Sequence, residues 1–153
     1  MLLPKRMDTP PARVMILAIG LQESRFKHRR QMVGSPPKPI GPAAGFWQFE
    51  RGGGCASVLA HRASGHWMRA VCAERKVEPT SLALWEALQR DDVLAAAAAR
   101  LLLWTDPRPL PAIGEVDDAW DYYIRNWRPG KPHRETWDEQ YRTAVWHVTG
   151  DNA

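Results

Sequence analysis

The sequence has few of the residues that mark disulfide-rich and zinc-binding proteins. It has two cysteines among 153 residues, Cys55 and Cys72, and neither has a second cysteine at the spacing of a zinc site. This pattern argues against a structural metal ion. The count allows one disulfide, but we expect two free, partly buried thiols.

The sequence also lacks a hydrophobic run long enough to cross a membrane. The apolar stretch VMILAIGL at 14–21 leads directly into Gln22 and Glu23. A membrane-spanning helix needs about 20 apolar residues, and no small-residue cleavage site follows this stretch. We therefore expect a buried helix here, with no signal peptide and no membrane insertion, in a protein made in the cytoplasm.

Several catalytic patterns are missing. His61 and His66 are five residues apart, which is wrong for a helical i, i+4 metal pair, and Ser24 and Ser57 lack the Gly-x-Ser-x-Gly turn of many hydrolases. The sequence contains no Gly-x-x-x-x-Gly-Lys phosphate loop. These absences give no support to metal, serine-hydrolase or phosphate-loop chemistry.

Tryptophan and positive charge, by contrast, are abundant. The chain contains eight Trp and carries a formal net charge of +4, with a pI near 9.4. Most tryptophans serve the core, and a few on exposed loops would stack on sugars or bases. The charge gives a mild bias toward anionic partners, which leaves nucleic acid, anionic lipid and anionic cell-wall polymer open.

Helical patterns dominate the chain and predict an all-α fold, α+β at most, in a single domain over residues 1–153. The Pro- and Gly-rich stretch 33–45 predicts an irregular loop. GFWQFE at 45–50 is expected to be extended and to end at the glycines 52–54, so that the region 33–54 forms a small β-hairpin and loop. The first expected helix starts at Thr9, which is followed by two prolines, and ends at about Phe26 or Lys27. Two more are expected over 55–62 and 64–76, and a fourth starts at Thr80 or Ser81, with Leu82, Trp85 and Leu88 facing inward. The last three run from Asp91 or Asp92 to Trp104, over 115–127 and over 135–149.

Glu23 is the first candidate for chemistry. It lies three and four residues beyond Gly20 and Ile19, so it continues an apolar helix face. A carboxyl group there is partly desolvated, which favours its protonated form, and a neutral carboxylic acid can protonate a leaving oxygen. The spacing alone favours a simpler role, in which Glu23 reaches water or pairs with Arg25 or Lys27.

Two ordered motifs change this interpretation. Gln-Glu-Ser at 22–24 ends the buried helix, and Pro-Ala-Ala-Gly-Phe-Trp-Gln follows the loop at 42–48. The pair resembles the soluble lytic transglycosylases and goose-type lysozymes, in which a Glu-Ser pair closes a buried helix and Gly-Ala-x-Gly-Leu-Met-Gln comes after a loop. Ala43, Gly45 and Gln48 match the second motif, whereas Pro42, Phe46 and Trp47 depart from it.

The resemblance implies a peptidoglycan-cleaving enzyme with a lysozyme-like helical fold. Glu23 would be the general acid and then the base at the β-1,4 bond between N-acetylmuramic acid and N-acetylglucosamine, with no cofactor. Ser24 would hydrogen-bond near that carboxylate or the substrate. The segment from Gly45 to residue 49 would line the cleft, with Gln48 on the sugar. Phe46 or Trp47 would offer a ring to a pyranose, although we expect at least one of these rings to fill the core.

The family's late Tyr-Asn pair has only a loose counterpart here. Asn126 and a glycine four residues later echo an Ala-Tyr-Asn-x-Gly pattern, but Arg125 stands at the tyrosine position. Tyr123 lies one helical turn before Asn126. We therefore expect Tyr123, rather than Tyr122, to take the tyrosine's place.

Glu50 leaves the outcome of the reaction open. By the resemblance, a lytic transglycosylase needs one carboxylate, because the muramic C6 hydroxyl attacks and leaves a 1,6-anhydro product, whereas glycosidases normally use two carboxylates. Glu50 would share a face with Gln48 in an extended segment, and could then make the enzyme a hydrolysing muramidase. Its simpler role is an ion pair with Arg51 or Arg25.

The resemblance also suggests a bacteriophage or prophage product that acts as a monomer on bacterial peptidoglycan and not on nucleic acid. It would be an endolysin that reaches the periplasm and cell wall, or a lytic protein carried in the virion. A rival from a different class is a non-enzymatic phage structural module that binds glycan in the same cleft.

Overall fold

The computed structural model describes residues 2–151 and is mostly helical, with one two-stranded antiparallel sheet in that part of the chain. This confirms the predicted fold class, all-α with a minor β element. A short 3-10 helix at Lys5–Met7 precedes the α-helices. The α-helices are α1 (Pro10–Ser24), α2 (Ala56–Ala60), α3 (Gly65–Glu74), α4 (Ser81–Ala87), α5 (Asp92–Trp104), α6 (Val116–Trp127) and α7 (Arg134–Thr149), and the strands are β1 (Ala43–Ala44) and β2 (Phe49–Glu50).

Three helices begin at a capping side chain that the sequence places there. Thr9 caps α1, Thr80 caps α4 and Asp91 caps α5, in each case by accepting a hydrogen bond from a backbone amide three residues later. Each side chain satisfies one amide that the first helical turn leaves without a partner. The alternatives, Ser81 and Asp92, lie inside their helices.

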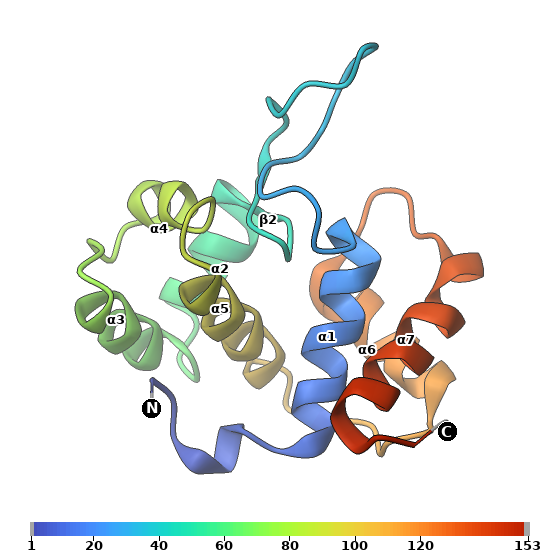
Figure 1. Ribbon diagram of the computed structural model, residues 1–153. Coiled ribbons are helices and arrows are strands. Elements are labelled where there is room, and N and C mark those ends of the chain that lie inside the picture. The colour runs from blue at the N-terminus through green and yellow to red at the C-terminus, as the bar shows by residue number, and fades with distance from the viewer. Residues whose placement is uncertain (1, 152–153) are drawn as a thin grey trace.

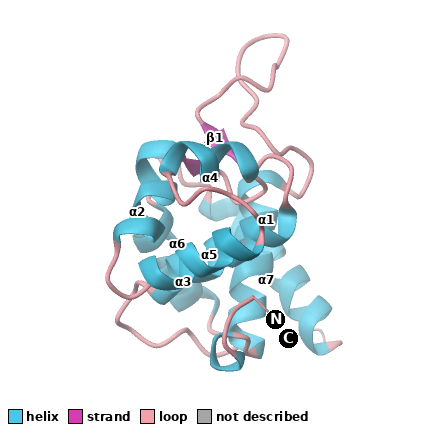
Figure 2. Cartoon of the chain, turned by 90° about the vertical axis from the view of Figure 1, so that its left-hand side faces the viewer, coloured by secondary structure: helices cyan, strands magenta, loops and turns pink. Residues whose placement is uncertain are grey.

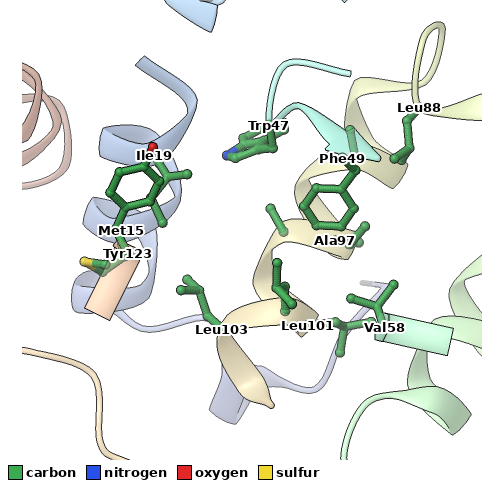
Figure 3. Packing of buried hydrophobic residues seen from close by; sticks show 14 of the residues in the cluster. Met15, Ile19, Trp47, Phe49, Val58, Leu88, Ala97, Leu101, Leu103 and Tyr123 are labelled. Atoms are coloured by element: carbon green, nitrogen blue, oxygen red, sulfur yellow. The ribbon is translucent and has the colours of Figure 1, made fainter. Parts of the chain in front are cut away.

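Helix α1 lies near the centre of the molecule (Figure 1). It packs against α6 and α7 on one side and against α5 on the other, and α2 and α3 pack against α5 in turn. Their buried side chains form a cluster in which Ile19 and Leu101 are fully excluded from solvent. Figure 3 shows part of this cluster around Ile19, Leu101 and Tyr123. The core therefore fixes α1, whose last turn carries Glu23.

The segment 45–50 is not the extended strand that GFWQFE predicted. Strand β1 pairs with β2, and residues 45–48 form the turn between them. Gly45 has a φ of 73° and Gln48 a φ of 53°, and the Gln48 amide donates to the Gly45 carbonyl at 3.0 Å. Left-handed backbone at both ends of the turn interrupts the side-chain alternation. Gln48 and Glu50 therefore do not share a strand face.

Residues 31–42 form an arm that projects from the body of the molecule (Figures 1 and 2). The amides of Val33 and Lys38 each donate to the other residue's carbonyl at 2.9 Å. At the base of the arm, the Arg30 guanidinium donates to the Gly41 carbonyl. The stretch that the sequence predicted as irregular is thus a braced arm.

Two further expectations differ from the structure. The glycines 52–54 do not end an element but belong to Arg51–Cys55, a wide helical turn that runs into α2 and kinks at the middle glycine (φ −100°, ψ −105°). In α4, Leu82 is 41% exposed, because Leu84 and Leu88 form the buried i, i+4 pair that faces the core.

Cys55 and Cys72 are both free, as predicted, and are fully buried rather than partly so. Burial raises the pKa of Cys55 to about 12 and also raises that of Cys72, which keeps both thiols protonated. No helix within residues 2–151 has the length and apolar character needed to cross a membrane.

Candidate active site

Glu23 lies in the last turn of α1 with its side chain half-buried. The hydroxyl of Tyr123, on α6, donates a hydrogen bond to Glu23 Oε1 at 2.6 Å. Tyr123 is 3% exposed, and its ring stacks on Trp137 of α7 with the centroids 5.2 Å apart and the planes 5° apart. Helices α6 and α7 together therefore hold one carboxyl oxygen of Glu23 in place.

The two neighbouring tyrosines of α6 make different contacts. The Tyr122 hydroxyl lies 3.2 Å from the Leu103 carbonyl oxygen and 3.1 Å from the Arg108 carbonyl oxygen, so these two acceptors share its single proton. Tyr122 thus braces the connection between α5 and α6. Of the two candidates, the structure brings Tyr123 to Glu23.

Burial dominates the electrostatics of Glu23. Desolvation raises the pKa of its carboxyl group from 4.5 to about 7, although the hydrogen bond from Tyr123 acts in the opposite direction. Burial and the adjacent Glu23 also raise the pKa of Tyr123, so the phenol remains a hydrogen-bond donor. A carboxyl group with a pKa near neutrality can both give and take a proton at physiological pH, which suits general acid–base chemistry.

Glu23 lines a cleft with a volume of about 1350 Å³. Its lining includes the hairpin, the glycines 52–54 that follow it and residues of α2, together with the α5–α6 connection and residues 125–131 at and after the end of α6. Pockets for drug-sized ligands are about 300–1,000 Å³. The cleft therefore has room for an extended ligand such as an oligosaccharide.

Gln48 and Glu50 both line this cleft, as expected. The Gln48 Nε2 donates to the Gly45 carbonyl at 2.9 Å, which fixes the amide and leaves its Oε1 as an acceptor for a ligand. Glu50 is exposed. The ion pair of Glu50 with Arg51 or Arg25 is not formed within residues 2–151.

Ser24 supports the hairpin rather than the cleft surface. Its hydroxyl donates to the Phe46 carbonyl at 2.7 Å and accepts from the Phe26 amide at 3.2 Å. The serine is not part of the cleft lining among residues 2–151. It instead ties the end of α1 to the hairpin turn, which fixes Glu23 relative to Gln48.

The hairpin aromatics do not form the expected platform for a sugar. Trp47 is 6% exposed, and its Nε1 donates to the Ile16 carbonyl at 2.8 Å. Phe46 is half-buried, and neither ring lines the cleft described here. Gly45 is buried where a Cβ atom would lie 3.0 Å from the Leu88 carbonyl, so it serves close packing.

Aromatic rings at the cleft come instead from Trp127, at the end of α6, and from Phe49 of β2. The two rings meet edge to face with their centroids 5.8 Å apart. The Trp127 Nε1 donates to the Trp47 carbonyl at 2.9 Å. Trp127 is not among the predicted site residues, and its position directly after Asn126 is the one signal for it in the sequence.

Asn126 lines the cleft and is held by Asp106, which is not among the predicted site residues. The Asn126 Nδ2 donates to Asp106 Oδ2 and to the Tyr122 carbonyl, both at 2.8 Å. Arg125 Nε donates to the same Asp106 oxygen at 2.8 Å, and the Arg108 amide donates to Oδ1 at 3.0 Å. Burial alone would raise the pKa of Asp106, but these hydrogen bonds outweigh it and lower the pKa. Asp106 therefore stays ionised and orients both side chains.

No family model, curated protein or solved structure matches this chain. Within residues 2–151, no group of three or more His, Cys, Asp or Glu side chains is placed to hold a metal ion.

Proposed function

We propose that the chain is a peptidoglycan-cleaving enzyme of the lytic transglycosylase type, with Glu23 as the catalytic acid and base. The observation that carries this proposal is a half-buried carboxyl group, with a pKa raised to about 7, that lines a large cleft and accepts a hydrogen bond from a buried tyrosine. The two motifs that resemble the family also meet here, because Glu23 and Gln48 line the same cleft.

The reaction begins with neutral Glu23. Tyr123 occupies Oε1, so Oε2 carries the proton and donates it to the glycosidic oxygen as the bond from that oxygen to the muramic C1 breaks. The C6 hydroxyl of the same sugar attacks C1, and the Glu23 carboxylate accepts the hydroxyl proton. The products are a 1,6-anhydro sugar and a free hydroxyl on the departing N-acetylglucosamine, with Glu23 neutral again.

The other carboxyl groups of the cleft favour a mechanism with a single carboxylate. Asp106 is held by Arg125 and Asn126 and stays ionised, so it is poorly suited to proton transfer. Glu50 is exposed. A hydrolysing muramidase that uses Glu23 and Glu50 is the second candidate, because both side chains line the same cleft.

The proposal places the protein on the bacterial cell wall, as a phage or prophage endolysin or as a lytic protein carried in the virion. It would act as a monomer on glycan strands and not on nucleic acid, and it would need no cofactor. A non-enzymatic module that binds glycan in the same cleft is the rival from a different class.

Glu23→Gln separates the enzyme from the binding module. Purified sacculi are incubated with the wild type, with Glu23→Gln and with the matched variant Glu50→Gln, and both solubilisation and co-sedimentation are measured. We expect Glu23→Gln to abolish solubilisation while it still sediments with the sacculi. Solubilisation that survives in Glu23→Gln, or that the wild type never shows, would contradict the proposal. Loss in both variants would favour the hydrolase.

A further inference from the structure

Four cationic side chains line the cleft beside Asn126. Arg108 comes from the α5–α6 connection, Arg125 from the last turn of α6, and Arg128 and Lys131 from the chain that follows it. We call these four residues the basic wall. Arg108, Arg128 and Lys131 are exposed, and none of the three forms an ion pair within residues 2–151.

The acidic groups of the cleft neutralise only part of the basic wall, and exposed Glu50 is one of these groups. Near pH 7 about half of the Glu23 carboxyl groups are neutral, because burial raises the pKa to about 7. Asp106 and Arg125 neutralise each other at 2.8 Å, so the uncompensated positive charge belongs to Arg108, Arg128 and Lys131. Several cations that line one cleft with few counter-charges attract anionic ligands and raise their local concentration.

Arg125 is the most rigidly held member of the basic wall. Its Nε donates to Asp106, whose side chain is 3% exposed, and its guanidinium carbon lies 4.9 Å from the centroid of the Tyr122 ring. These contacts use Nε and one face of the group, while the side chain stays 34% exposed. The two Nη groups remain as a preorganised pair of donors, a geometry that matches a carboxylate.

We propose that Arg125 binds a carboxylate of the glycan strand, with Asp106 as its positioning residue and the rest of the basic wall attracting the same charge. The substrate is then a glycan that carries free carboxylates, rather than a neutral one. This inference rests on the proposed function and names the part of the substrate that the cleft selects.

The test compares native sacculi with sacculi whose carboxylates have been converted to neutral amides. Binding is measured by co-sedimentation in a Glu23→Gln background, so the result does not depend on catalysis. We expect binding to amidated sacculi to be weaker by about tenfold or more. Equal binding to both preparations would overturn the proposal, whether or not the wild type cleaves either one.

Variants assign the effect to particular residues. Arg125→Gln should bring binding to native sacculi down to the amidated level and leave binding to amidated sacculi unchanged. Arg125→Gln also leaves Asp106 without its ionic partner. A second variant, Arg128→Gln with Lys131→Gln, therefore changes only exposed groups, and it should lose part of the preference for native over amidated sacculi. Arg142→Gln, on α7 and outside this cleft, is the matched control and should keep the full preference for native sacculi.

Two further outcomes distinguish a carboxylate site from the proposed enzyme activity and from general binding of polyanions. If native sacculi are bound preferentially but the wild type yields no cleavage products, the proposed function fails while the carboxylate site stands. If a short DNA duplex at the same salt concentration binds more tightly than native sacculi, and Arg125→Gln weakens it equally, the basic wall is a general polyanion surface and the proposal is wrong.

Discussion

Replacing Glu23 by Gln should change how the stability of the protein depends on pH. In the wild type, burial keeps the Glu23 carboxyl group protonated up to a pKa of about 7, whereas the ordinary value is 4.5. Glutamine has nearly the same shape and cannot ionise. The difference in unfolding free energy between the two proteins therefore isolates the ionisation of this one group.

The size and sign of the effect follow from the two pKa values. Between pH 4.5 and about 7, the folded state holds a proton that the unfolded state has lost, so the wild type loses stability as the pH rises. The shift corresponds to about 3 kcal/mol in total. This contribution is fully present when the pH is below the pKa of Glu23 in the unfolded state. It is lost once the pH rises above the pKa of Glu23 in the folded state.

Urea unfolding at about pH 4, 6 and 8 measures the difference, with tryptophan fluorescence as the signal. Stability of the wild type relative to Glu23→Gln should fall by about 3 kcal/mol from the lowest pH to the highest. Glu50→Gln, at an exposed position of the same cleft, is the matched control that removes one carboxylate without emptying a buried site. If the difference in unfolding free energy between the wild type and Glu23→Gln does not change with pH, burial does not oppose the ionisation of Glu23 and the reasoning is wrong.

Three other substitutions probe the site and its support. Tyr123→Phe removes the hydrogen bond that lowers the pKa of Glu23, so the alkaline limb of the pH–rate profile should move to higher pH; an unmoved limb would argue against that contact. Trp47→Ala empties a buried site, and chemical denaturation should show a loss of about 3–5 kcal/mol; a loss below about 1 kcal/mol would mean that Trp47 is not core. Asp106→Asn removes the charge that holds Arg125, so binding to native sacculi should weaken while binding to amidated sacculi does not; equal weakening of both would assign Asp106 a merely structural role.

The parts of the fold that could be predicted depend on short-range chemistry. Thr9, Thr80 and Asp91 cap helices through amides three residues away, a distance at which sequence is informative. Glu23 could be singled out because helical spacing places it on the apolar face that includes Ile19 and Gly20. These predictions needed no knowledge of how the helices pack.

The parts that could not be predicted depend on contacts between distant segments. The buried Trp47 side chain donates a hydrogen bond to Ile16, 31 positions away in the chain. No local sequence pattern predicts this contact. Asp106 gains its role from Arg125 and Asn126, which lie 19 and 20 positions away. A lone aspartate before a proline carries no such signal, since its partners meet it only through tertiary packing.

In the hairpin, one backbone feature makes a prediction based on side-chain alternation wrong. The alternation of GFWQFE placed Gln48 and Glu50 on one face of a strand, but the left-handed backbone at Gln48 (φ 53°) makes 45–48 a turn. Both side chains still line the cleft. Both residues therefore lie at the cleft, although the predicted extended conformation was wrong.

Mass spectrometry of peptidoglycan digested with the wild type and with Glu23→Gln is the most direct test of the central claim. We predict 1,6-anhydro muropeptides from the wild type and none from Glu23→Gln. Ordinary reducing-end muropeptides would replace the transglycosylase by a hydrolase and make Glu50 the next residue to change. The absence of products from either protein, or equal products from both, would contradict Glu23 as the catalytic acid.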